Sequence, residues 1–366
     1  MATTQIGRAN ARAVQRWSTK LLHETKANSV WKNLIGKGEG SETPVIEMTD
    51  LKRDTGEGIL VQLAIPIKGE PAYGDDRLEG TEAQLSTYTD LVYIDLLSKS
   101  VDCGGIMTRK RTPIEMRGYG QRMLSRYFSD IHDQLLFMYA GGARGVNTDF
   151  HFPTTFAGHA GNSFEAPDTN HILYGGAATS KASMASTDVF DLTVVEKART
   201  KIRTLGGDAS EIAEIQPIMA GGKQTWVFFL HEWQLHKLRT VTGEGKWLDL
   251  QKNLATANAE KNSIFTGGEA MHAGMILRGH KNVIRFSDYG AGANVAAARA
   301  FVLGQQAISV AYGNVGNGYA ADWTETLENR GGNPIITGRL MVGVKKLRSN
   351  SQDTGMLTVD TAAAAP

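Results

Sequence analysis

The stretch from Gly58 to Gly142 decides the fold. It opens with the strand-like run Gly58-Ile-Leu-Val-Gln-Leu-Ala-Ile-Pro-Ile67 and returns through a second strand-like run, Tyr88-Thr-Asp-Leu-Val-Tyr-Ile-Asp95. A turn-rich acidic tip separates the two runs. An isolated two-stranded hairpin is only marginally stable in water, because it cannot bury its own faces. We therefore expect a neighbouring copy of the chain to bury this hairpin, as in a self-assembling shell.

A long amphipathic helix is predicted after the hairpin, over residues 113–140. Thr112-Pro-Ile-Glu115 has the pattern of an N-cap, a proline at the first helical position and a capping box. No stop signal follows before Gly141-Gly142. About 28 residues at roughly 1.5 Å each give a rod of roughly 42 Å. Its apolar residues recur at helical spacing and predict one core-facing stripe: Met116, Tyr119, Met123, Tyr127, Phe128, Ile131, Leu135, Met138 and Tyr139.

Charge is uneven along the chain, although the net charge is only +1. Residues 1–40 carry seven Lys/Arg against two Asp/Glu, residues 69–95 carry one against seven, and residues 99–126 carry seven against two. Acidic and basic segments of neighbouring copies can pair, which fixes register more than it adds affinity. The candidate inter-subunit contacts are therefore Asp75, Asp76, Glu79, Glu82, Arg109, Lys110, Arg111, Arg117 and Arg122, together with Trp17 and Trp31 of the N-terminal segment.

Composition excludes several classes of protein. The single cysteine, Cys103, rules out an intrachain disulfide framework and is expected to be a small buried residue. No apolar run approaches the roughly 20 residues that span a bilayer. The N-terminus is polar and lacks the apolar stretch of a secretory signal. No partner membrane is expected.

The remaining elements follow from periodicity. Residues 1–57 are predicted to form an arm whose apolar anchors, among them Leu21 and Leu34, are too sparse for a core of their own. Residues 143–187 are predicted to be a long loop, and residues 349–366 a disordered tail. The other predictions are a helix over 192–205, a buried strand over 225–230, a helix over 232–239, strand material over 301–312, and a half-buried strand over 335–347 with Ile336, Leu340, Val342 and Val344 on one face.

Histidines raise the question of a metal site. His231-Glu-Trp-Gln-Leu-His236 places its histidines five residues apart, whereas zinc-protease helices place them four apart, facing one metal. His151, His159 and His171 share the long loop and are either metal ligands or, as we expect, solvated side chains. No nucleotide-binding motif or nucleophile elbow occurs. We expect no catalytic site, metal or cofactor.

Two blocks carry a resemblance to a known family. One is Gly69-Glu-Pro-Ala-Tyr-Gly-Asp-Asp-Arg-Leu-Glu-Gly-Thr-Glu82 with Val92-Tyr-Ile-Asp95 and the long helix. The other is Trp226-Val-Phe-Phe-Leu-His-Glu-Trp-Gln-Leu-His-Lys-Leu-Arg239, with Lys246-Trp-Leu-Asp-Leu-Gln251 and Asn262-Ser-Ile-Phe-Thr-Gly267. Over roughly residues 55–345 the chain resembles the phage major capsid proteins named for gene product fifty-six of phage N-four. It departs from them at Glu232, where the family often has proline.

The resemblance implies an α+β fold of the type first seen in the capsid of phage Hong Kong ninety-seven. The implied parts are an N-terminal arm (1–57), an extended β-hairpin loop (58–105) and a peripheral domain (106–187) with a spine helix (113–140). An axial domain (188–324), a returning strand of the peripheral domain (325–350) and a C-terminal tail (351–366) complete the chain.

The resemblance also implies a function. The expected protein is a phage major capsid protein that self-assembles into hexamers and pentamers of an icosahedral head around double-stranded DNA. It would assemble in the host cytoplasm and reside in the virion. Implied partners are portal, scaffold and decoration proteins, and packaged DNA bound non-specifically at the inner face. The alternative is an encapsulin-type nanocompartment, distinguished by the cargo that co-purifies. A metal-dependent hydrolase built on the histidine-rich loop is a third hypothesis.

Overall fold

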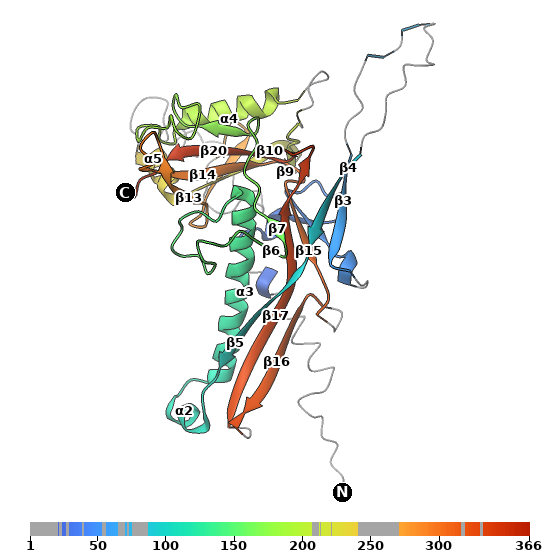
Figure 1. The fold of residues 1–366 in the computed structure, drawn as a ribbon, viewed down its shortest axis with the longest axis vertical. Coiled ribbons are helices and arrows are strands. Elements are labelled where there is room, and N and C mark those ends of the chain that lie inside the picture. Colours follow the sequence, from blue (N-terminus) through green and yellow to red (C-terminus); the bar gives the residue numbers. More distant parts are fainter. Residues whose placement is uncertain are drawn as a thin grey trace.

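A computed structural model describes residues 21–366 apart from 22–23, 27–28, 39, 53–55, 65–69, 72, 75–86, 207–211, 213, 221, 241–270, 316–318 and 330–331. Two sheets lie at different levels of an elongated molecule, and one long helix connects them (Figure 1). The chain alternates between the two levels, so each sheet contains strands from distant parts of the sequence.

The first sheet is built on one long strand, β17 (Asn333–Lys346). Its first half lies between β16 (Ala321–Glu328) and β5 (Asp95–Asp102), and its second half pairs with β15 (Ile308–Tyr312). Strands β2 (Val45–Met48) and β1 (Ile35–Lys37) extend the sheet beyond β15 in parallel. Residues along β17 alternate between buried and half-buried, and the four predicted core residues are all buried. The predicted strand is confirmed.

The predicted hairpin pairs as expected. Strand β3 (Gly58–Ala64) is antiparallel to β4 (Thr87–Tyr93), with Gly58 opposite Tyr93 and Ala64 opposite Thr87. In Figure 1 this pair leaves the body of the molecule beside β15. Ile59, Val61 and Val92 are buried at its base, in a cluster with residues of β2 and β15. The base of the hairpin is thus anchored in its own chain.

The long helix begins later than predicted. Helix α2 (Ile106–Arg111) comes first, and Thr112 is its C-terminal cap in extended conformation. Helix α3 (Met116–Gly141) then begins with Glu115 at its N-cap and no side-chain capping bond. The prediction of a capping box at Thr112 is therefore wrong, because Thr112 Oγ1 donates backward to the carbonyl of Thr108 at 3.0 Å. The predicted end is confirmed: Gly142 adopts a left-handed conformation with φ 66°.

The second sheet has the strand order β11 (Met271–His272), β12 (Met275–Gly279), β10 (Lys223–Leu230), β14 (Val295–Leu303), β20 (Met356–Ala362) and β8 (Ile172–Tyr174). Strand β13 (Arg285–Tyr289) pairs with β14, and β9 (Ile218–Ala220) pairs with β10. Helices α4 (Leu192–Thr204) and α5 (Glu232–Thr240) pack on this sheet (Figure 1). Both helices and the strand β10 are confirmed.

The C-terminus contradicts its prediction as a disordered tail. All seven residues of β20 are buried, and the strand pairs with β14 over its whole length, from Ala362 opposite Ala297 to Met356 opposite Leu303. Strands β18 (Arg348–Ser349) and β19 (Gln352–Asp353) form a small hairpin just before it. Most of this segment therefore forms part of the folded body, and only residues 364–366 are exposed beyond it.

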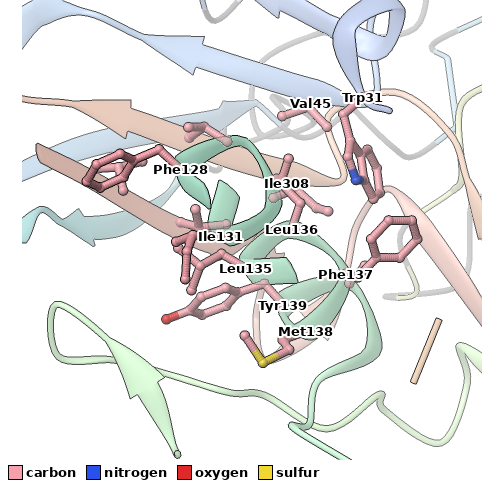
Figure 2. Close-up of a cluster of buried hydrophobic side chains, with 14 of the residues drawn as sticks. Trp31, Val45, Phe128, Ile131, Leu135, Leu136, Phe137, Met138, Tyr139 and Ile308 are labelled. Atoms are coloured by element: carbon pink, nitrogen blue, oxygen red, sulfur yellow. The ribbon is translucent and has the colours of Figure 1, made fainter. Parts of the chain in front are cut away.

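The main hydrophobic core surrounds the C-terminal part of α3. Leu135, Leu136 and Phe137 are fully buried there, and residues of both sheets pack around them. Trp31 and Val45, from the N-terminal part of the chain, belong to this core, and Figure 2 shows Phe137 beside the tryptophan. The short helices η1 (Lys32–Leu34) and η2 (Asp50–Lys52) lie before β1 and after β2.

The segment 143–187 is ordered by buried polar contacts. It contains the small hairpin β6 (Gly158–His159) and β7 (Asn162–Ser163), whose backbone bonds the hydroxyl of Tyr139. His159 is buried, with Nε2 at 3.0 Å from the carbonyl of Val342. His171 is fully buried, with Nδ1 at 2.8 Å from Asp168 Oδ2. The expectation of solvated histidines is wrong for these two residues.

Candidate assembly surfaces

The described residues of 21–34, which we call the arm root, run along the side of α3. Ser125 Oγ donates to Glu24 Oε2 at 2.7 Å, and Ser129 Oγ donates to the carbonyl of Thr25 at 3.2 Å. Residues four apart lie on one face of a helix, so these serines form a polar row under the arm root. The arm root is therefore attached to the body of its own chain.

Trp31 belongs to the interior of its own chain. Its side chain is 0% exposed, and its ring lies 5.1 Å from the ring of Phe137, 4.9 Å from that of Phe229 and 6.1 Å from that of Phe301. Leu21 and Leu34 are also buried. The expectation that Trp31 contacts another subunit is therefore wrong, and the described anchors, which are too sparse for a core of their own, join the core of the same chain. The apolar partners come from distant elements. Trp17 lies outside the described residues.

Asp75, Asp76, Glu79 and Glu82, the predicted acidic contacts, lie outside the described residues. The first described acidic residue after them in the sequence, Asp90 of β4, forms an ion pair with Lys345 of β17 within the same chain.

The predicted basic contacts divide into paired and exposed residues. Arg109 donates to the carbonyl of Gly332 at 2.9 Å, and Arg117 forms an ion pair with Glu325 of β16. These two guanidinium groups help to hold α2 and the start of α3 against the β16–β17 turn. Lys110, Arg111 and Arg122 have exposed side chains. The exposed three remain candidates for contacts with another copy.

A surface missed in the sequence lies at the end of the molecule where α2 meets the β16–β17 turn (Figure 1). We call it the distal tip, and it exposes large apolar side chains: Ile106 (62%), Met107 (58%), Ile114 (53%), Tyr119 (45%), Met123 (40%) and Leu327 (54%). The N-terminal part of the predicted inner stripe is thus wrong at Tyr119 and Met123. The signal available in the sequence was Ile106-Met107, an apolar pair separated by one residue from the basic run Arg109-Lys110-Arg111. Clustered exposed apolar residues mark interaction sites in soluble proteins.

No metal-binding geometry occurs among the described residues, where no three potential ligands gather in one place. His231 is buried and His236 exposed, so they do not face a common site. Burial, with Arg285 and His280 nearby, lowers the pKa of His231 to about 4. Cys103 is buried, and burial raises its pKa, which makes the thiol unreactive. Among the residues that the structure describes, no helix is long and apolar enough to cross a membrane.

Comparison with known proteins identifies the family. A model of phage capsid proteins matches residues 5–365. The chain belongs to the phage capsid protein family. It is 39% identical to the capsid protein of Ralstonia phage GP4, with a TM-score of 0.85 over 100% of this chain and 99% of that one. It is also 26% identical to the major capsid protein of Pseudomonas phage KPP25, over 95% of this chain and 94% of the relative.

A more distant structure shows the same fold. The capsid of cyanophage Pam1 is 18% identical and has a TM-score of 0.70 over 92% of each chain. The predicted α+β capsid fold of the Hong Kong ninety-seven type is thus confirmed. As a phage capsid protein, the chain is a structural component of the virion.

Proposed function

We propose that this phage capsid protein is the major shell subunit of a tailed phage. Its copies form hexamers and pentamers that close into an icosahedral head around double-stranded DNA. The observation that carries the proposal is the similarity to the capsid of Ralstonia phage GP4, which extends over the whole chain. The relative from Pseudomonas phage KPP25, which bears the name major capsid protein, supports the same reading.

The domain assignment is part of this proposal. The first sheet and the distal half of α3 fit a peripheral domain, and the second sheet with α4 and α5 fits an axial domain. The β3–β4 hairpin fits the extended loop. Because β20 lies in the second sheet, we assign residues 356–362 to the axial domain instead of a tail.

Two kinds of contact between copies follow. The acidic segment 69–95 docks on exposed basic residues of a neighbouring α2 and α3, such as Lys110, Arg111 and Arg122. The exposed apolar side chains of the distal tip supply the non-polar part of the interface. Changing Asp75 and Asp76 together to lysine should block assembly and leave the monomer folded. Normal shells from this variant would refute the docking of the acidic segment.

The remaining partners are inferred from the role of a head. They are a portal protein, a scaffold, possible decoration proteins and DNA held non-specifically at the inner face, where the basic segment 1–40 suits a polyanion. This function requires no catalysis, metal or cofactor. Nothing in the sequence or the fold favours an encapsulin-type compartment over a phage head.

Electron microscopy of the purified full-length chain, expressed alone and with its neighbouring phage genes, tests the proposal. Closed shells of uniform size built from hexamers and pentamers are the expected result. Nuclease-protected DNA should appear in particles from infected cells. Persistent monomers under every condition, or shells that enclose an enzyme and no genome, would contradict the assignment.

A further inference from the structure

Asp133 is buried at the point where the arm root crosses α3. Asp133 is only 5% exposed, and its carboxylate accepts two hydrogen bonds from the arm root. The hydroxyl of Ser29 donates to Oδ1, and the backbone N–H of Val30 donates to Oδ2 at 3.2 Å. Trp31 follows directly and fills the core. A change at Asp133 therefore acts on the residues that anchor the N-terminal segment.

The surroundings of Asp133 do not balance its negative charge. Among the described residues, no cationic side chain forms an ion pair with it. Lys26 of the arm root is engaged elsewhere: its Nζ lies 2.6 Å from Glu47 Oε1 and 4.4 Å from the centre of the Tyr312 ring. Asp130, one turn earlier on α3, adds a like charge.

The neighbouring histidine cannot supply the missing charge. His132 is fully buried, with Nε2 at 2.9 Å from the hydroxyl of Tyr312, and burial lowers its pKa to about 4. It is therefore neutral above pH 5. The ionisable groups close enough to interact with Asp133 are Asp130 of α3 and Tyr312 of β15. Lys26 of the arm root and Glu47 of β2 act on the adjacent His132.

These surroundings favour the neutral carboxyl while the arm root is docked. Burial raises the pKa of Asp133 from 3.8 to about 6, although the bonds from Ser29 and Val30 favour the ionised form. A carboxyl whose pKa is higher when docked than when released binds more protons in the docked state. Docking is then strongest below pH 3.8, and this contribution is lost as the pH rises through about 6.

We propose that Asp133 makes the arm root a proton-controlled latch. The neutral carboxyl holds Ser29 and Val30 against α3, and ionisation leaves an unpaired buried charge that loosens the arm root. The latch belongs to the single chain, so it does not depend on the proposed assembly into a head. Through it, pH controls how strongly the arm root is held on α3.

Hydrogen–deuterium exchange of the unassembled full-length chain tests the latch. Peptides covering residues 21–34 are followed from pH 5 to pH 7.5, and each rate is divided by that of the same peptide unfolded. Local opening in the wild type should rise about tenfold over this range, mostly below pH 6.5, as expected for a carboxyl with pKa values of 6 docked and 3.8 released. Asp133→Asn keeps an acceptor for Val30 and removes the charge, so its opening should not vary with pH.

Two further variants separate the latch from an ordinary structural bond. Asp130→Asn, a matched change at an exposed carboxyl one turn away, should retain the pH dependence. Ser29→Ala removes a donor that favours the ionised form, so the midpoint of opening should move to higher pH. Equal pH dependence in the wild type and Asp133→Asn overturns the proposal. If Asp133→Asn does not fold, an unchanged midpoint in Ser29→Ala overturns it instead.

Discussion

The two halves of α3 lie in different surroundings. From Ile131 to Gly141 every residue is buried, including polar ones, because both sheets and the segment 143–187 pack around this half. From Met116 to Asp130 only one face is buried, and Tyr119 and Met123 are exposed on the other. A helix that is apolar on one side belongs to a surface, and a helix buried all round belongs to a core. One helix thus serves chain stability at its C-terminal end and offers a free face at its N-terminal end.

The strongest test of the buried half is to delete β20, whose Asp360 pairs with the arginine that caps the end of α3. At the C-terminus of α3, Arg299 of β14 donates to the carbonyl of Gly141 at 3.0 Å and forms an ion pair with Asp360 of β20 at 2.8 Å. Deleting residues 356–366 removes β20 and leaves Arg299 buried without its carboxylate, which is strongly destabilising. We expect an unfolded, insoluble chain, as judged by circular dichroism and solubility. Deleting the exposed residues 364–366 is the control, and it should leave folding unchanged.

Truncating a single side chain in the buried half should also lower the stability of the chain substantially. Phe137 is 0% exposed and contacts the rings of Trp31, Phe229 and Phe301. Phe137→Ala should lower the free energy of unfolding by about 3–5 kcal/mol, because it leaves a cavity in a packed aromatic cluster. Chemical denaturation measures the change. Tyr119→Ala, in the half-exposed part, should stay within about 0.5 kcal/mol of the wild type. Similar losses from the two variants would erase the difference between the halves.

Local sequence patterns could predict the elements that bury one face, but not a strand that buries polar residues on both. The alternation along β17 and the spacing in α4 report burial of one face, so both elements were predicted correctly. β20 was missed because it is buried on both faces and contains Thr358, Asp360 and Thr361, which look solvated in sequence. The partner that makes Asp360 acceptable, Arg299, is 61 residues away. Such a pairing exists only in the folded chain.

The start of α3 and the assembly surfaces were missed for related reasons. Thr112-Pro113 suits a helix start by local chemistry, but α2 already uses Thr112 as its end. His159 was expected to be solvated, but it is buried against the carbonyl of Val342, which lies far away in the sequence. The basic residues were predicted as a group to contact another copy, yet only the fold reveals that Arg109 and Arg117 are engaged within the chain.

The free face of the distal tip should matter to assembly and hardly at all to the monomer. Ile106 and Met107 are more than half exposed, so replacing both with serine removes little buried area from the single chain. If the pair forms part of an interface worth about 1.4 kcal/mol, the concentration needed for assembly should rise about tenfold. Light scattering against concentration measures it, with the melting temperature as the check on folding. Unchanged assembly would remove the distal tip from the list of contacts.

The smallest effect is expected where the half-exposed end of α3 meets β16. Arg117 and Glu325 form an ion pair, but their side chains are 38% and 17% exposed, so water and salt screen the attraction. Exposed pairs are worth about 0–1 kcal/mol. A double-mutant cycle of Arg117→Met and Glu325→Gln, measured by urea unfolding, should give a coupling energy in that range, shrinking as salt is added. A coupling of several kcal/mol that resists salt would mean that this end of α3 is as much a part of the core as the other, and the contrast between the halves would fail there first.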